Sequence, residues 1–218
     1  MTWLTRVGIV ALTAVLLTAC ATPGNPGGEP DATPGVLPAA SPTQPPEAPA
    51  GGSSAPAADG VVIGQGTVLQ VGKAAPQFCL GGIAESYPPQ CTGPEIADWD
   101  WAQAQQSETA SDVTWGAYAV TGTWNGTEFT RTGVPIPLAL YDTVPLEDPL
   151  AGRQGSTGRQ DLDRILQQIG VGEHLVASGV RRGFVTVTVV YDDGSFQARM
   201  DAEYGPDVVV VLSALRSA

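Results

Sequence analysis

One stretch decides the fold class: Tyr118-Ala119-Val120-Thr121-Gly122-Thr123-Trp124-Asn125-Gly126-Thr127-Glu128-Phe129-Thr130-Arg131. Its Asn-Gly pair fits a type I′ turn, because both central residues of that turn need a positive φ. Pairing outward from the turn places Trp124, Gly122 and Val120 on a mostly apolar face with Phe129. The ring of Phe129 is expected opposite Gly122, where it could cover the bare backbone. The pattern predicts a half-buried antiparallel hairpin.

Short strands are expected on both sides of this hairpin. Residues 61–63 and 67–71 are apolar, and Gly64 and Gly66 between them indicate a bulge. Residues 134–141 continue the apolar signal, and their prolines confine them to a sheet edge or the start of a strand. Together these segments predict a small antiparallel barrel or sandwich.

A helix is expected after a polar loop at 145–155. Thr157 and Gln160 match a capping box, and an i, i+3, i+4, i+7 stripe of apolar residues follows. Gly170 and Gly172 would end the helix. The stripe consists of Leu162, Ile165, Leu166 and Ile169.

A second hairpin is expected over residues 185–202, with its turn at Asp193-Gly194. A third strand would follow at 207–212. These elements predict an α+β, β-rich fold: a small antiparallel barrel or sandwich, followed by one helix packed on an antiparallel sheet.

The first residues have the pattern of an export signal. A single positive charge in residues 1–6 precedes an apolar run at 7–17, which is too short for a comfortable membrane span. The run ends in Leu17-Thr18-Ala19-Cys20, which resembles the lipobox of bacterial lipoproteins. The resemblance implies cleavage after residue 19 and attachment of acyl chains such as palmitate to Cys20. Membrane lipid would then be a partner, and the extracytoplasmic face of the cell membrane the location.

Residues 20–59 are expected to form a tether. They are rich in Pro, Gly, Ala, Ser and Thr and contain no aromatic residue, so they cannot bury enough apolar surface to offset the entropy of ordering. The predicted organisation is a signal peptide at 1–19, a disordered tether at 20–59 and a globular domain at 60–218. Whether the domain divides into subdomains at 60–145 and 156–218 stays open.

The three cysteines also fit an exported protein. Lipidation of Cys20 leaves Cys79 and Cys91 as a pair in a compartment that permits disulfides. Between them lies a loop with two glycines and two prolines and no periodicity. The pair lacks the Cys-x-x-Cys spacing of redox centres, and a metal site would need further ligands. We therefore expect a structural disulfide.

The net charge of -12 bears on the partners. An anionic surface with few lysines is repelled by phosphate backbones, so we expect no nucleic-acid partner. We also expect no cofactor. A protein or glycan of the cell envelope fits the predicted location better.

Asp98-Trp99-Asp100-Trp101 is the most unusual short motif in the chain. In an extended segment both Trp side chains would share one face and both Asp side chains the other. Trp99 and Trp101 could then stack on a ligand ring, and the carboxylates could bind calcium. The alternative is a strand with a buried Trp face and a solvent-exposed Asp face, which the absence of an Asp-rich calcium loop favours.

The motifs of common hydrolases are missing. The chain has a single histidine, His174, and no Gly-x-Ser-x-Gly motif that would present a nucleophilic serine for it to activate. It also has no phosphate-binding glycine loop. The sequence favours a non-catalytic binding or interaction module at the cell surface. A secreted-side hydrolase using acidic residues is an alternative. A carbohydrate-binding module using exposed Trp99, Trp101, Trp115 or Trp124 is another, and it predicts two coplanar, exposed indoles.

Three further motifs resemble a group of actinobacterial lipoproteins and membrane-anchored proteins without an assigned activity. They are the loop from Phe78 to Cys91, the motif Asp98–Trp101, and the segment from Tyr191-Asp192-Asp193-Gly194 to Tyr204-Gly205-Pro206. The resemblance covers most of the predicted domain. It implies that this region folds as a domain, and it implies no particular catalytic or binding activity.

Overall fold

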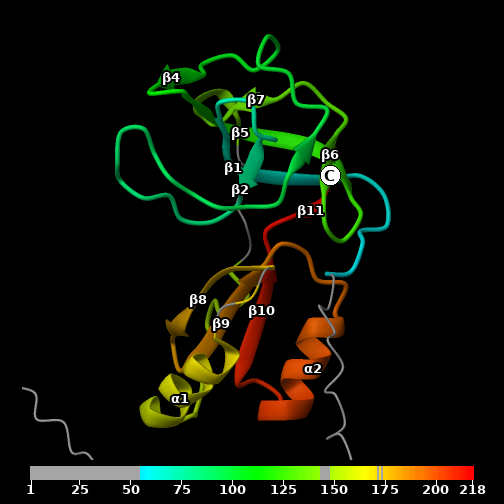
Figure 1. The fold of residues 1–218 in the computed structure, drawn as a ribbon. Coiled ribbons are helices and arrows are strands. Elements are labelled where there is room, and N and C mark those ends of the chain that lie inside the picture. The colour runs from blue at the N-terminus through cyan, green and yellow to red at the C-terminus, as the bar shows by residue number, and fades with distance from the viewer. Residues whose placement is uncertain (1–54, 143–147, 171, 173) are drawn as a thin grey trace, which may run out of the picture. The chain divides into compact units, whose positions relative to one another are not determined.

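The computed structural model describes residues 55–142, 148–170, 172 and 174–218 (Figure 1). The predicted signal peptide, Cys20 and the tether up to residue 54 lie outside the described residues. The described residues all belong to one compact unit. None of the described helices has the length and apolarity needed to cross a membrane.

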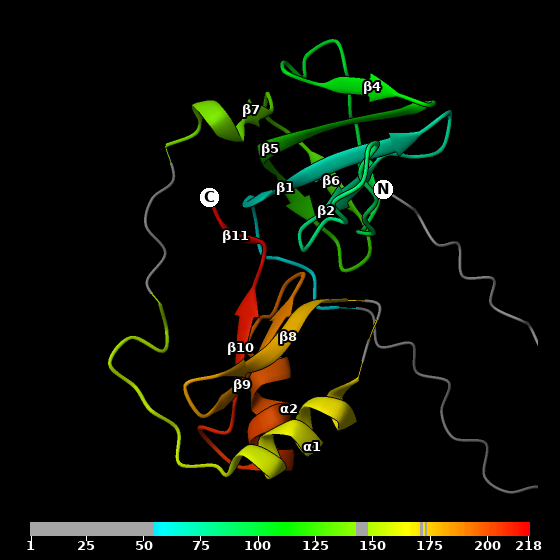
Figure 2. The ribbon, with the colours of Figure 1, turned by 90° about the vertical axis from the view of Figure 1, so that its left-hand side faces the viewer.

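The fold is α+β and β-rich, which confirms the predicted class. The described residues form eleven strands, two α-helices and one 3-10 helix (Figures 1 and 2). Eight strands form one sheet, in the order β11-β1-β5-β6-β3, with β2 paired to β1 and with β4 and β7 paired to β5. These strands are β1 (Val62–Val71), β2 (Gln77–Cys79), β3 (Ile96–Ala97), β4 (Glu108–Ala110), β5 (Val113–Trp124), β6 (Phe129–Arg131), β7 (Ile136–Pro137) and β11 (Arg216–Ser217).

β1 and β5 form the centre of this sheet. They pair antiparallel without a break from Val62↔Gly122 to Val71↔Val113, so the bulge expected at Gly64 and Gly66 is wrong. The two glycines are needed for a different reason, which is the close packing of other residues against β1. A Cβ on Gly66 would lie 2.3 Å from the carbonyl oxygen of Cys79, and one on Gly64 would meet the Phe78 ring at 2.9 Å. They allow β2 and the core to approach β1 closely.

The hairpin of β5 and β6 has the predicted faces and a different register. Trp124 pairs with Phe129, so the connection has four residues rather than two. The Asn125 side chain explains the longer loop, because its Oδ1 accepts hydrogen bonds from the backbone N–H groups of Thr127 and Glu128 at 2.9 and 2.8 Å. A Cβ on Gly122 would still lie 2.6 Å from the Phe129 ring, as the predicted glycine–aromatic contact requires.

The main core lies under the inner face of this sheet. Phe78 and Phe129 pack edge to face with their ring centroids 5.2 Å apart, and Trp124 is buried beside them. Val190 and Leu215 from the second half of the chain belong to the same buried cluster. The edge position expected for the prolines at 134–141 is confirmed, because the short strand β7 pairs with β5 at the rim of the sheet.

The second half of the chain forms a three-stranded sheet, in the order β10-β9-β8. β8 (Leu175–Arg181) and β9 (Phe184–Val189) are antiparallel, whereas β9 and β10 (Val209–Ser213) are parallel. The predicted hairpin over 185–202 is therefore wrong, and so is an all-antiparallel sheet. Between β9 and β10 the chain forms the helix α2 (Ser195–Tyr204), which makes the β-α-β crossover that parallel strands need.

Asp192 explains why the Asp-Asp-Gly sequence begins a helix and not a hairpin. Its carboxylate accepts hydrogen bonds from the backbone N–H groups of Phe196 and Gln197, which have no partner within the helix. The real hairpin turn of this half is Arg182-Gly183, and both of its residues have positive φ.

The predicted apolar stripe of the helix α1 (Arg159–Ile169) is confirmed. Leu162 and Ile165 are buried against the sheet, and Gly170 ends the helix with φ +64°. The capping box is wrong by one position, since the N-cap is Gly158 and makes no side-chain hydrogen bond. α1 and α2 share one apolar cluster with β9, while Leu150 from the loop at 148–155 packs on Phe184 and Val210.

Candidate functional site

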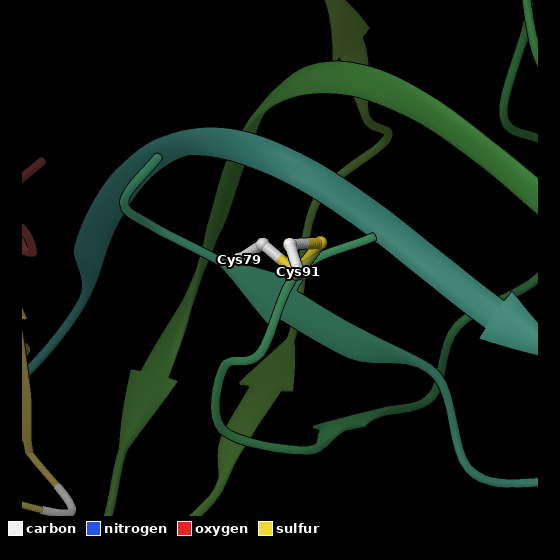
Figure 3. The surroundings of a disulfide bond; sticks show 2 residues. All are labelled: Cys79 and Cys91. Carbon is white, nitrogen blue, oxygen red and sulfur yellow. A yellow bond between two sulfur atoms is a disulfide. The ribbon is translucent and has the colours of Figure 1, made fainter. Parts of the chain in front are cut away.

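The disulfide between Cys79 and Cys91 is present, which confirms the predicted pair (Figure 3). Its Cα atoms are 6.0 Å apart. Cys79 ends β2 and is buried, so the bond ties the irregular loop at 80–91 to the sheet.

The loop has further internal order. The backbone N–H of Ala84 donates to the carbonyl of Gln90 at 2.9 Å, and the Ser86 hydroxyl donates to the carbonyl of Pro88 at 2.9 Å. These bonds place Tyr87 at the tip of the loop, where its side chain is 74% exposed.

Tyr87 contacts Trp115 of β5. Their ring centroids are 5.4 Å apart and their planes are nearly perpendicular, at 88°. Between the loop and the strands lies a groove of about 570 Å³, which we call the aromatic groove. It is lined by Thr67, Ile83, Ser86, Tyr87, Pro89, Gln106, Glu108, Trp115, Gly116, Ala117 and Ala139.

Strand register builds the floor of the aromatic groove. Thr67 of β1 pairs with Cys79 on one side and Ala117 on the other, and Trp115 pairs with Glu108 of β4. Because side chains alternate along a strand, these residues share the face opposite the core. The clamped loop supplies the facing wall.

The rim of the groove is polar and carries one carboxylate, that of Glu108. β4 reaches this position through a two-residue turn, Ser111-Asp112, in which both residues have positive φ. Such a turn normally uses Asn or Gly, so the residue types Ser-Asp did not predict it. The groove therefore combines two aromatic rings, an apolar loop and a few hydrogen-bonding groups, the usual composition of a small-ligand site.

Trp99 and Trp101 lie elsewhere and in a different arrangement from the one predicted. β3 ends at Ala97, Asp98 has φ +56°, and the motif forms a turn and not a strand. The two indoles pack edge to face at 5.3 Å with an interplanar angle of 78°, and both are half-buried against the core. They offer no shared flat surface, so this geometry does not favour the predicted ligand-stacking role.

The polar atoms of this motif are used within the turn. Asp100 accepts hydrogen bonds from the backbone N–H of Ala102 and the side chain of Gln103, and the Trp101 indole donates to Gln70 at 2.5 Å. The buried indole N–H of Trp99 has no hydrogen-bond partner among the described residues. In the described part of the chain, no group of three His, Cys, Asp or Glu side chains is placed to hold a metal ion.

The shifted pKa values belong to structural contacts outside the groove. Hydrogen bonding to the backbone of Leu150, with Arg181 and Arg182 nearby, lowers the pKa of Asp148. Hydrogen bonds to Ser195 lower the pKa of Asp193, and burial raises the pKa of Tyr118. Each shift has a cause in folding, so none of them identifies a catalytic group.

Sequence reasoning named Trp115 only as one of four tryptophans and missed Tyr87. The signal was weak: an aromatic residue before two prolines, inside a loop closed by two cysteines. Comparison with protein-family models, with curated proteins and with solved structures finds no match for this chain.

Proposed function

We propose that this chain is a lipid-anchored binding module of the cell envelope and that its ligand lies in the aromatic groove. One observation carries the proposal. Tyr87 is 74% exposed, yet it is held against Trp115 at the mouth of a groove whose loop is closed by a disulfide. A rigid, exposed aromatic side chain lowers the entropy lost on binding, because little of it must be ordered.

The chemistry of the groove favours a neutral glycan. The faces of sugar rings carry C–H groups that pack against aromatic rings, while their hydroxyls need acceptors and donors nearby. The exposed ring of Tyr87 offers one such face, while Trp115 stands perpendicular to it at 88° and does not extend it into one flat surface. Glu108 and Gln106 provide the polar groups. The single charge in the lining is a carboxylate, which disfavours an anionic polymer.

The anchoring part of the proposal rests on the sequence. The lipobox motif ending at Cys20 is the reason to place the protein on the extracytoplasmic face of the membrane. The spacer that we propose runs over residues 20–54, because Pro56 and Ala58 of the predicted tether are hydrogen-bonded to Trp124 of the domain. Globomycin treatment, or Cys20→Ala, is expected to release the mature protein from the membrane fraction or to leave the precursor unprocessed. Unchanged membrane-bound mature protein would contradict the anchor.

The ligand is tested by titrating the purified protein with neutral cell-envelope oligosaccharides, beginning with N-acetylglucosamine tetramers. The indole N–H signals report binding by NMR, and the signal of Trp115 is expected to move. Tyr87→Ala should weaken binding about tenfold, since it removes both stacking and buried area.

Val134→Ala is the matched control, because Val134 is 67% exposed and does not line the groove. Its affinity is expected to equal that of the wild type. The groove is the wrong site if Tyr87→Ala binds as tightly as the wild type, or if the signals of Trp99 and Trp101 move and that of Trp115 does not.

A further inference from the structure

A second pocket surrounds the only histidine of the chain. His174 lies between Gly172 and the start of β8, and its backbone carbonyl accepts a hydrogen bond from Val190. The pocket, of about 190 Å³, is lined by residues of β8, β9 and α2 and by Ala55 and Pro56. We call it the histidine pocket. It shares no lining residue with the aromatic groove.

Trp124 holds two walls of the histidine pocket in place. Its indole N–H donates to the carbonyl of Pro56 at 3.0 Å, and its backbone carbonyl accepts from Ala58 at 3.0 Å. The ring of His174 stands edge to face on the same indole, with the ring centroids 6.5 Å apart. Since Trp124 itself is buried, this side of the pocket is formed before any ligand arrives.

The interior of the pocket is apolar on most sides. Ile169, Leu175 and Phe196 line it with hydrocarbon. Sites for drug-sized ligands usually measure roughly 300–1,000 Å³, so the histidine pocket suits a fragment with a single ring or a short alkyl chain.

Its polar end is cationic, in a protein whose net charge is -12. Arg199 lies over the Phe196 ring at 4.5 Å and has no carboxylate within ion-pair distance among the described residues. Five other arginines of the described chain form such pairs: Arg153, Arg159, Arg164, Arg181 and Arg182. A guanidinium beside an apolar pocket and an imidazole attracts a ligand that carries one negative charge.

The start of α2 does not supply this attraction. The carboxylates of Asp192 and Asp193 already accept the backbone N–H groups of Ser195, Phe196 and Gln197. Recognition of an anion would therefore fall to the side chains of Arg199 and His174. We propose that the histidine pocket binds a small carboxylate with a ring-sized apolar body, whose carboxylate pairs with Arg199.

The test uses benzoate and its neutral isostere benzamide on the purified protein at fixed pH. Because the chain has one histidine, its imidazole C–H signals in the NMR spectrum are assigned directly. His174 also lines a neighbouring cavity with Thr127 and Val176, so the ring signals of Phe196, which lines only the histidine pocket of the two, complete the readout. Benzoate is expected to shift these signals and to saturate, and benzamide to bind about tenfold more weakly or less, since it lacks the charge-assisted bond.

Arg199→Met should remove the preference for benzoate over benzamide, and Arg199→Lys should keep part of it. Arg216→Met is the control, because it removes the same charge from a residue outside the pocket. Circular dichroism and the unfolding midpoint verify that each variant folds. Equal binding of benzoate and benzamide, an undiminished preference in Arg199→Met, or no saturable shift of His174 would each overturn the proposal.

Discussion

Removing the disulfide should cost the domain about 3–4 kcal/mol of unfolding free energy. The change is Cys79→Ala together with Cys91→Ala, so that no free thiol remains. The cross-link spans 12 residues, for which loop-closure entropy gives about 3 kcal/mol. Cys79 is 1% exposed, and the loss of its buried sulfur adds about 1 kcal/mol.

Guanidinium unfolding measures the total effect, as a lower midpoint with a nearly unchanged slope. The oxidised wild type treated with a reductant is the control and should reach the stability of the double variant within about 1 kcal/mol. Hydrogen exchange measures the local effect at the amide of Ala84, which donates to Gln90 inside the loop. That amide should lose protection before the β1–β5 pair does.

The same variant tests how the loop and the groove depend on each other. If the loop opens, Tyr87 leaves Trp115, and affinity for any ligand of the aromatic groove falls with it. A loss below about 1 kcal/mol with the Ala84 amide still protected would refute the reasoning. It would show that the loop is held by its own hydrogen bonds and its packing on the sheet.

Three other changes follow from the structure. Gln197→Met should lower the unfolding free energy measured in urea by about 1–3 kcal/mol and expose the amide of Val211 to hydrogen exchange. The reason is that the Val211 N–H, on the free edge of β10, donates to the Gln197 side-chain oxygen at 2.8 Å. Unchanged protection of that amide would contradict this. Asp148→Asn should lower stability at neutral pH. Its pKa is lowered in the folded state, so its contribution is present above the ordinary carboxyl value of 3.8 and is lost as pH falls through the folded value; unfolding midpoints of variant and wild type should converge in acid. Gly122→Ala should destabilise by about 1–3 kcal/mol, since its Cβ would lie 2.3 Å from the carbonyl of Thr130; an unchanged melting temperature would show that β6 can shift.

The sequence predicted those features that depend on local periodicity. The apolar face of the hairpin at 118–131 and the stripe of α1 are both present, because burial follows side-chain alternation and helical spacing. The disulfide followed from cysteine counting. The strand-edge position of β7 followed from its prolines.

The predictions are wrong where a short polar side chain accepts hydrogen bonds from backbone N–H groups. Asn125 lengthened a turn by accepting backbone N–H groups, and Asp192 converted an expected hairpin into a helix. In both places the residue types fit either outcome, and only the tertiary contacts distinguish them. The aromatic groove was beyond prediction for another reason. It joins Tyr87 and Trp115 across a loop whose path depends on the disulfide and on β4.

The short strand β11 has a consequence for the order of folding. It pairs with the first residues of β1, Val62↔Ser217 and Ile63↔Arg216, and Leu215 just before it is fully buried in the main core. During synthesis the edge of β1 at Val62 is therefore unpaired until a strand more than a hundred residues later has emerged. Contacts so distant in sequence form slowly, and an unpaired strand edge can recruit another chain in the meantime. We expect the β1–β5 pair to form first and the closure by β11 to come last.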